Sequence, residues 1–197
     1  MLKVGITGGI GAGKSVVCRV FHTLGIPVFD ADHAAKMLMD TDPTLIAGIT
    51  KLLGPGVYTS GKVNREQLAA AVFKDKSLLQ QLNALVHPAT IDYGKKWMQQ
   101  QNAPYTIKEA AIFFESGSYK DMDVMVGVTA PEELRISRAM QRSGMTREKV
   151  QERIASQMND AEKMAMCDHV IINDDKQAII PQVMQLHSQL LDRAKLR

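Results

Sequence analysis

The sequence predicts an α/β fold built around a parallel sheet. Short apolar runs alternate with segments of helical spacing along much of the chain, and this alternation is typical of parallel sheets. The first apolar run, Leu2 to Thr7, leads through a glycine loop into a helical segment from Lys14 to Leu24. The length of 197 residues, with 45% hydrophobic and 23% charged residues, fits one globular domain with a modest insertion.

The segment after the first helix predicts a second strand. Gly25 stands where a C-terminal helix cap belongs, and the apolar run at 27–29 ends at Asp30. Asp32 then opens another helical pattern, where an acidic residue suits the positive end of the helix dipole. Strand, glycine loop, helix and strand therefore follow one another at the start of the chain.

The middle of the chain, residues 41–101, predicts several helices and no strand. Asn64 begins a capping-box pattern at the start of one of them. His87-Pro88 should interrupt the helical run that begins near residue 77, because proline disfavours helical backbone in the residue before it. We interpret this stretch as a mainly helical insertion.

The second half of the chain returns to alternating strands and helices. Pro131 stands at the start of one helix and Thr146 at the cap of another. Pro181 should interrupt or kink the terminal helix. The expected strands are 105–114, 122–129 and 169–172. Three helices are expected: one that starts near residue 131, one at 146–158 and one at 177–197.

The segment Gly8 to Ser15, GGIGAGKS, matches G-x-x-x-x-G-K-[ST] in full and stands between a predicted strand and a predicted helix. Its glycines let backbone N–H groups turn inward around a phosphate, and the helix that follows adds its positive dipole end. Lys14 should reach the β- and γ-phosphates of ATP, and the Ser15 hydroxyl should ligate Mg²⁺. A glycine turn that merely tightens the junction is the alternative. The motif does not identify the acceptor of the phosphate.

Three carboxylates follow predicted strands and should lie at the sheet edge where ligands bind. Asp30 or Asp32 could take the proton from an attacking hydroxyl; equally, Asp32 could cap its helix and Asp30 could be a turn residue. Glu115 could lie near the magnesium waters or the substrate, or only end a strand in solvent. These alternatives remain open at the level of the sequence.

Arg135, Arg138 and Arg142 are spaced three and four apart, which places them on one helix face. Arginines on a moving lid would stabilise the charge of a transferring phosphoryl group. The alternative is a solvated basic face. His87 could hydrogen-bond a substrate, or could be a partly buried structural histidine.

Composition excludes several other classes. The net charge of +3 is spread along the chain, without a run of like charges that would bind nucleic acid. Cys18 and Cys167 are too few for a disulfide framework and should be inert in a reducing compartment. No signal peptide or apolar stretch of about 18 residues is present. We expect a cytoplasmic protein without nucleic-acid or membrane partners.

In their order and spacing, several pieces of the chain together resemble the dephospho-coenzyme A kinase family. That family transfers the ATP γ-phosphate to the ribose 3′-hydroxyl of dephospho-coenzyme A in the last step of coenzyme A synthesis. The resemblance runs nearly end to end. The pieces are Thr7–Ser15, Asp30–Asp32, Asn64-Arg65, His87-Pro88, Phe114-Glu115, Arg138 with Arg142, Gln157-Met158 and Asp168–Asn173.

The resemblance implies a P-loop NTPase fold of the nucleotide-kinase type: a three-layer sandwich with a five-stranded parallel sheet, a helical substrate-binding insertion and a lid. Residues 1–197 would form a single P-loop kinase domain, as a monomer or weak homo-oligomer. Its parts would be a core of 1–40, 104–134 and 168–197, a helical coenzyme-binding region at 41–103 and a lid at 135–167.

The resemblance also implies roles for individual residues. Asp32 would be the general base, with Lys14 and Arg138 as further catalytic residues. Dephospho-coenzyme A would contact Asp32, Arg65, His87 and Glu115. ATP, with Mg²⁺ on Ser15, would contact Gly9, Gly11, Ala12, Gly13, Lys14, Ser15, Val16, Arg142 and Asn173.

The chain departs from the family's usual pattern at three places. Ala111–Phe114 stands where the family usually has Pro-Leu-Leu, Ser143 stands where an aspartate is common, and Val16 replaces a frequent threonine. Shikimate, gluconate and nucleoside kinases share the phosphate loop, but the middle segment with Arg65 and His87 argues against them. A GTPase-like switch is the remaining alternative, although a guanine-specific Asn-Lys-x-Asp segment is missing.

Overall fold

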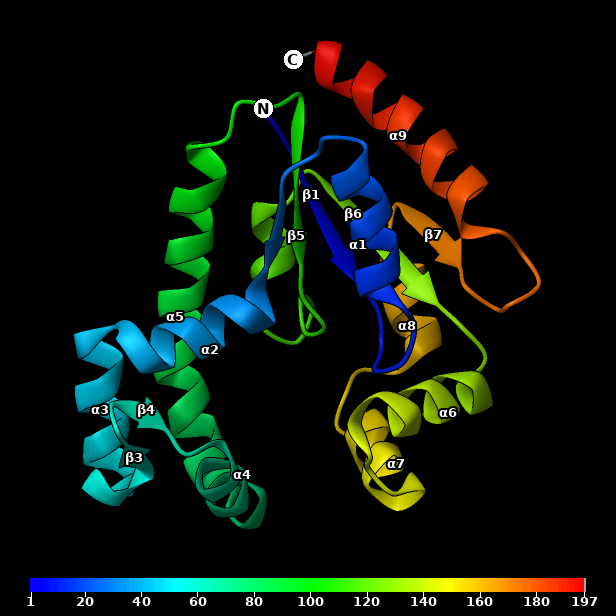
Figure 1. Cartoon of the computed structure of the whole chain (residues 1–197). Coiled ribbons are helices and arrows are strands. Elements are labelled where there is room, and N and C mark those ends of the chain that lie inside the picture. The colour runs from blue at the N-terminus through cyan, green and yellow to red at the C-terminus, as the bar shows by residue number, and fades with distance from the viewer. Residues whose placement is uncertain (197) are drawn as a thin grey trace. The chain divides into compact units, whose positions relative to one another are not determined.

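The computed structural model describes residues 1–196, except for the side chains of residues 73 and 74, and forms two compact units (Figure 1). One unit comprises Met1–Asp30 and Gln100–Arg197 and contains a sheet; the other, Ala31–Gln99, is mainly helical. The helical unit overlaps the insertion expected at 41–103. Within the described chain, no helix is both long and apolar enough to cross a bilayer.

The sheet has five strands, all parallel, in the order β2-β5-β1-β6-β7. The strand that precedes the glycine loop is therefore central, with one neighbour on each side. The predicted five-stranded parallel sheet is confirmed. The strands are β1 (Leu2–Thr7), β2 (Val28–Asp30), β5 (Tyr105–Glu109), β6 (Val124–Thr129) and β7 (His169–Ile172).

Helices α1 (Lys14–Thr23) and α9 (Ile179–Lys195) cover one face of the sheet and share its main hydrophobic core (Figure 1). Phe21 of α1 meets the ring of Tyr105 edge-on, with ring centres 6.4 Å apart. The hydroxyl of Tyr105 is hydrogen-bonded to Nδ1 of His187 in α9, at 2.5 Å. These contacts join both helices to β5.

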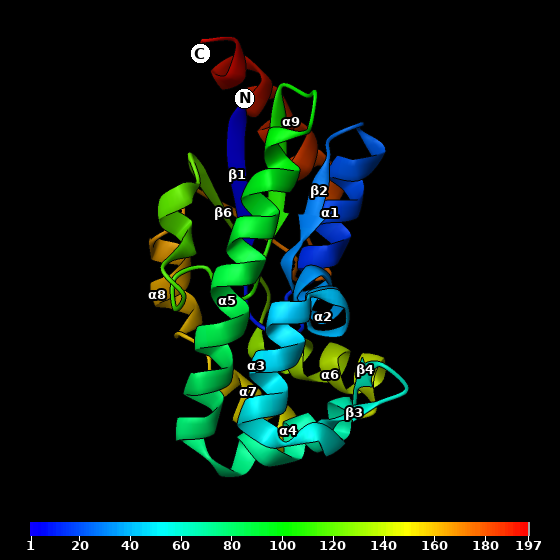
Figure 2. The same ribbon diagram turned by 90° about the vertical axis from the view of Figure 1, so that its left-hand side faces the viewer.

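The opposite face of the sheet carries α8 (Asp160–Ala165), which packs against β6 (Figure 2). The absence of a side chain at Gly127 makes room for Met164, because a Cβ there would overlap the Met164 sulfur. Helices on both faces give the predicted three-layer architecture. Beside the sheet, α6 (Glu132–Ser143) and α7 (Arg147–Ala155) form a small core with Ile10 of the glycine loop.

The helical unit has its own hydrophobic core. Helix α5 packs against both α2 and α3 (Figure 2). Ile49 of α3 and Val86 of α5 are among the residues buried between them. The elements are α2 (Ala31–Thr41), α3 (Pro43–Leu53), the 3₁₀ turn Pro55–Val57, β3 (Tyr58–Thr59), β4 (Lys62–Val63), α4 (Arg65–Lys74) and α5 (Lys76–Gln99).

Local signals were correct at several helix ends. The Asn64 side chain accepts a hydrogen bond from the Gln67 amide, at 3.1 Å, and so caps α4 as expected. Gly25 follows α1 with φ of 82°, the left-handed conformation of a C-terminal cap. Such signals depend on a few neighbouring residues, which is why the sequence locates them.

The strand predicted at 105–114 is wrong after Glu109. The chain leaves the sheet there and forms turns, followed by the 3₁₀ segment η2 (Ser118–Asp121). Phe113 is nevertheless fully buried, with its ring 5.5 Å from Nζ of Lys108. Apolar residues in a buried turn give the same local pattern as a buried strand.

The predicted interruption at His87-Pro88 is also wrong, because α5 runs through Pro88 without a break. A proline inside a helix costs about 3 kcal/mol. Residues on either side of it, Val86 and Thr90 among them, are buried in the helical unit. Burial of this apolar face offsets the lost backbone hydrogen bond.

Two short strands, β3 and β4, were not expected in the middle segment. They pair through a turn at Ser60 and Gly61, whose φ angles of 51° and 77° are those of a tight hairpin. The signal was the Ser-Gly pair in the sequence.

The helix predicted at 146–158 ends at Ala155, and α8 follows it as a separate helix. The predicted interruption of the terminal helix near Pro181 is wrong. Because α9 begins at Ile179, Pro181 lies in its first turn, where its missing N–H has no intrahelical partner.

The cap at Gly25 gives a prediction about stability. Gly25→Ala should lower the free energy of unfolding by about 1 kcal/mol, because an alanine at this positive φ is strained. No atom lies within 4 Å of a Cβ at this position, so crowding adds nothing. Gly25→Asn is the control and should lose less free energy of unfolding than Gly25→Ala, since asparagine tolerates this conformation. Urea unfolding measures both; equal losses would contradict the backbone explanation.

Candidate active site

The loop between β1 and α1 opens at the carboxyl edge of the sheet, beside the N-terminus of α1. Gly13 has φ of 95°, and no side chain caps the helix that starts after it. The first amide groups of a helix lack intrahelical partners, and here no capping side chain meets them. The loop therefore presents N–H groups and a positive dipole end, which suits a phosphate.

Side chains from distant parts of the chain hold the backbone of this loop. The Ile10 amide donates to Oε1 of Gln157 at 3.1 Å. The backbone carbonyl of Ile10 accepts from Nε of Arg135, also at 3.1 Å. The Ala12 carbonyl accepts from Nδ2 of Asn173 at 2.8 Å. These hydrogen bonds fix the orientation of three peptide units of the loop: those between residues 9 and 10, 10 and 11, and 12 and 13.

The glycines of the loop allow these side chains to come close. A Cβ at Gly9 would overlap the guanidinium of Arg135, and a Cβ at Gly13 would overlap the amide of Asn173. At Gly11 it would overlap the backbone carbonyl of Arg135. Any other residue at these positions would displace either the loop or its supports.

Lys14 and Ser15 begin α1. Nζ of Lys14 donates to the carbonyl of Gly8 at 3.0 Å, so the side chain folds back over the loop. The Ser15 hydroxyl donates to Oε1 of Glu109 at 3.4 Å. Asp30 pairs in register with Glu109 on the adjacent strand. One amine, one hydroxyl and two carboxylates thus belong to the edge where the loop opens.

Glu109 was missed at the level of the sequence. The strand predicted at 105–114 would have placed Glu109 in its middle, whereas β5 ends at this residue. Burial is the main cause that raises the pKa of the Cys18 thiol, and the negative charge of Glu109 adds to it. Cys18 is buried, and a buried thiol with a raised pKa is a poor nucleophile.

The predicted arginines of α6 have three different environments. Arg135 is only 4% exposed and supports the loop. Arg138 donates to the Asn173 carbonyl at 2.9 Å and forms an ion pair with Asp175. Arg142 is exposed in the last turn. A single solvated basic face is therefore excluded.

Glu115 forms an ion pair with Lys163. Its Oε1 accepts from Nζ of Lys163 at 2.9 Å and from the Met158 amide at 3.0 Å, and the Lys163 side chain is fully buried. Burial alone would raise the pKa of Glu115. The two donors outweigh this effect and hold the pKa below its ordinary value. This pair attaches the turn after β5 to α8.

The remaining candidates lie in the helical unit. Asp32 is exposed in the first turn of α2, two residues after Asp30. Arg65 donates to Asp40 and to the carbonyl of Lys36, both at 2.8 Å. His87 is half-buried in α5, and burial lowers its pKa, so that its ring is neutral at pH 7.

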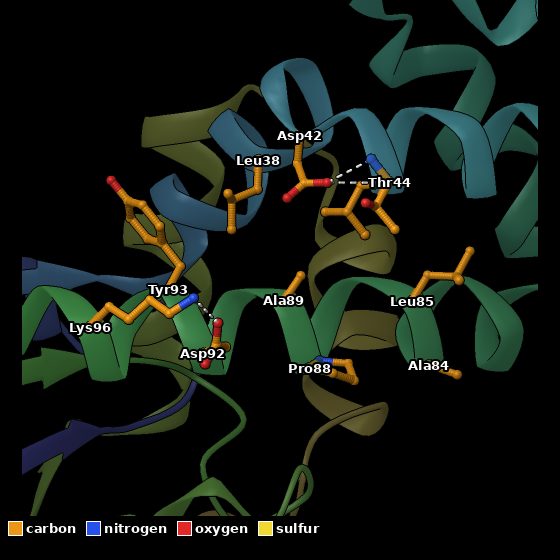
Figure 3. Close-up of a pocket in the computed structure, with 11 residues that line it drawn as sticks. Leu38, Asp42, Thr44, Ala84, Leu85, Pro88, Ala89, Asp92, Tyr93 and Lys96 are labelled. Carbon is orange, nitrogen blue, oxygen red and sulfur yellow. Dashed lines mark hydrogen bonds and ion pairs between the residues drawn. The ribbon is translucent and has the colours of Figure 1, made fainter.

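The helical unit also contains a groove of about 440 Å³ between α5 and the segment that joins α2 to α3 (Figure 3). Leu38 and Leu85 contribute to its largely apolar lining. Asp42 accepts hydrogen bonds from the first amides of α3, and Lys96 forms an ion pair with Asp92 at 2.8 Å. These charged groups already have partners, so the groove offers mainly an apolar surface.

Known proteins identify the family. A family model described as "Dephospho-CoA kinase" matches residues 2–178. The chain belongs to the dephospho-CoA kinase family. A relative named dephospho-CoA kinase from Porphyromonas gingivalis is 39% identical over 187 residues, which cover 94% of this chain and 93% of the relative. Another dephospho-CoA kinase, from Chlorobium chlorochromatii, is 40% identical over 205 residues, which cover 100% of this chain and 97% of the relative.

Solved structures agree with this assignment. A crystal structure from Thermus thermophilus has a TM-score of 0.84 at 30% identity and covers 98% of this chain and 97% of its own. Dephospho-CoA kinase from Campylobacter jejuni has a TM-score of 0.72 at 24% identity and covers 96% of this chain and 97% of its own. At this identity the likeness shows the fold alone. As a member of the dephospho-CoA kinase family, the chain is an ATP-dependent kinase with a small-molecule substrate, and the predicted resemblance is confirmed.

The Glu115–Lys163 pair of this family member gives a prediction about pH. Because the pKa of Glu115 is lowered on folding, its stabilisation is present above its ordinary pKa of about 4.5 and is lost as the pH falls. Glu115→Gln should lower the free energy of unfolding by about 1–3 kcal/mol at pH 7, because the buried Lys163 loses its counterion and keeps only its hydrogen bond to the Ala111 carbonyl.

Urea unfolding of the wild type and Glu115→Gln from pH 7 down to about pH 2 measures this effect. The difference between the two proteins should stay constant down to about pH 4.5 and shrink below it, because the wild-type carboxyl is protonated as the pH falls through its lowered pKa. Glu133→Gln, which removes an exposed partner of Arg147, is the control and should change little. A difference that stays constant over the whole pH range would contradict the ion-pair explanation.

Proposed function

We propose that this chain transfers the γ-phosphate of ATP to the ribose 3′-hydroxyl of dephospho-coenzyme A, giving coenzyme A and ADP. The observation that carries the proposal is the uncapped N-terminus of α1 behind a complete phosphate loop, in a member of the dephospho-CoA kinase family. Phosphoryl transfer depends mainly on positioning and charge, and such a loop supplies both.

We propose that the loop and the first turn of α1 hold the phosphates of ATP. Lys14 would exchange the Gly8 carbonyl for the β- and γ-phosphates, which are stronger acceptors because they are charged. Arg142 and Asn173 would lie by the adenine. The loop residues in contact with ATP would be Gly9, Gly11, Ala12, Gly13, Lys14, Ser15 and Val16.

The residues at this edge also fit a magnesium ion. Mg²⁺ prefers oxygen ligands and usually takes them from one hydroxyl or carboxylate, phosphates and water. The Ser15 hydroxyl, with Glu109 at 3.4 Å and Asp30 on the adjacent strand, provides such oxygens. We propose that Ser15 ligates Mg²⁺ directly and that the carboxylates orient its waters. When bound, the ion neutralises charge on the phosphates.

We propose that the helical unit binds the acceptor, through Arg65 and His87. Arg65 is held by Asp40, so that its orientation is set before a ligand arrives. A neutral His87 can donate one hydrogen bond and accept another, as a hydroxyl-rich ligand requires. Glu115 would contribute from the sheet-bearing unit, and Asp32 would accept the proton of the 3′-hydroxyl.

The region 135–167 would act as the lid, with Arg138 contacting the transferring phosphoryl group. In the structure Arg138 is paired with Asp175, whose side chain is 65% exposed. Exposed ion pairs contribute little to stability, so exchange of Asp175 for phosphate is energetically easy. The hydrogen bond from Arg138 to the Asn173 carbonyl would keep the guanidinium near the loop.

We further propose a cytoplasmic enzyme that is monomeric or weakly associated and binds no nucleic acid. Two observations support this. Cys18 and Cys167 are both free thiols, as is typical of a reducing compartment, and burial raises the pKa of Cys167 to about 11, which makes it a poor nucleophile. The charge is also spread evenly along the sequence.

A screen of acceptors tests the proposed reaction. The purified protein with Mg²⁺ and ATP should release ADP rapidly only when dephospho-coenzyme A is present. Shikimate, gluconate and a nucleoside serve as competing acceptors, because kinases of these substrates share the phosphate loop. Equal or faster ADP release with one of them would contradict the proposal, and release without any acceptor would indicate an NTPase instead.

Replacement of Asp32 tests the general base. Asp32→Asn should lower kcat by about 10²–10⁴, the usual range for a positioned base, while the affinity for ATP changes little. Asp30→Asn, two residues earlier, is the matched comparison and should affect Mg²⁺ dependence more than the proton transfer. Steady-state kinetics at several Mg²⁺ concentrations measure both variants. Undiminished kcat in Asp32→Asn would show that Asp32 is only a residue of the first helical turn.

A further inference from the structure

Arg135 is a buried charge next to the phosphate loop, and the proposed chemistry does not use it. It lies in α6 with only 4% of its surface exposed. Lysine and arginine are rarely buried to this degree unless they are paired. An arginine in such a place therefore needs both a counterion and acceptors for its N–H groups.

The structure supplies both. Nη1 of Arg135 lies 3.0 Å from Oδ1 of Asp160, and the other oxygen of Asp160 accepts from the Thr129 hydroxyl at 2.6 Å. Oδ1 of Asp160 is buried and has no hydrogen bond among the described residues. Its ion pair with Arg135 therefore offsets the cost of removing this oxygen from water. Nε of Arg135 donates to the Ile10 carbonyl, and Nη2 lies against Gly9.

Burial of this ion pair is a poor way to gain stability. Desolvation of two charges largely cancels their attraction, and apolar residues of similar volume often serve equally well. The neighbouring residues Ile136 and Ala139 already form an apolar core with Ile10. The arginine is therefore best explained by what its N–H groups do to the loop rather than by packing.

Its effect on the loop is specific. Arg135 holds the carbonyl of Ile10, and Gln157 holds the amide of the same residue. Hydrogen bonds from a charged donor are about twice as strong as neutral ones. Because the amide and the carbonyl of Ile10 are both hydrogen-bonded, the carbonyl stays directed toward the guanidinium of Arg135. The amides of the following loop residues then have little freedom to turn away from the phosphate site.

We propose that Arg135 is a positioning residue that sets the affinity for ATP through the backbone of the phosphate loop, with Asp160 as the counterion that keeps it in place. This inference rests on the proposed function, because it assigns the loop to ATP. Arg135 acts from outside the loop, and its loss should affect ATP far more than the acceptor.

The test separates positioning from stability. Arg135→Met keeps the length of the side chain but removes the charge and the donors; it should weaken equilibrium binding of ATP, without acceptor, about tenfold. It should also lower Tm, because Asp160 is left unpaired. Arg135→Met combined with Asp160→Asn removes the orphaned charge, so Tm should recover while ATP binding stays weak.

Two further variants complete the experiment. Arg135→Lys can reach only one of the two acceptors and should rescue ATP binding in part. Arg147→Met removes an exposed arginine from α7 and should leave both ATP binding and Tm unchanged. The KM for dephospho-coenzyme A should change less than twofold in all of them.

Failure of the inference can be distinguished from failure of the proposed function. If the wild type does not bind ATP, the proposed function is wrong, and the inference fails with it. If the wild type binds ATP and folded Arg135→Met binds it within twofold, the inference alone is overturned. It is also overturned if the double variant regains ATP affinity together with Tm. Should Arg135→Met not fold, wild-type affinity for ATP in the double variant overturns the inference equally.

Discussion

The phosphate loop has to keep its amide groups turned toward a ligand, and the rest of the sheet-bearing unit depends on this constraint. A glycine-rich loop cannot hold such a shape alone, because glycine loses more conformational freedom on folding than any other residue. The supports come from afar: Arg135, Gln157 and Asn173 are 125, 147 and 161 residues away from their partners in the sequence. The hydrogen bonds of the loop thus couple it to α6, to the segment just after α7 and to the residue that follows β7.

This coupling gives the segment after β6 two functions in our proposal. Its inner residues, Arg135 and Gln157, hold the loop, while Arg142 is exposed and available to a nucleotide. The Lys163–Glu115 pair attaches the same segment to the turn after β5. A segment anchored at these points can contribute arginines to ATP without losing its place beside the loop.

The sheet brings together groups that lie far apart in the sequence. Because all five strands are parallel, their carboxyl ends share one edge, and Asp30, Glu109 and Ser15 belong to it. The helical unit, which we propose binds the acceptor, is organised separately, since it has its own core and its own ion pair between Arg65 and Asp40. In our proposal the acceptor contacts the helical unit and, from the sheet-bearing unit, Glu115, so that variants of each unit test the two parts separately.

The sequence by itself determined the features that depend on near neighbours: the phosphate loop between strand and helix, the cap at Asn64, the turn at Gly25 and the parallel sheet. The resemblance carried by its motifs also gave the family. Only the tertiary structure decided that β5 ends at Glu109, that α5 continues through Pro88 and that Arg135 is buried with Asp160. Apolar residues look alike in a strand and in a buried turn, and an arginine three places from another looks solvated until its partner is known. The physical reason is range: capping and turn geometry act over a few residues, whereas burial and ion pairing depend on residues outside the local segment, such as Asp160 for Arg135, which the local pattern does not contain.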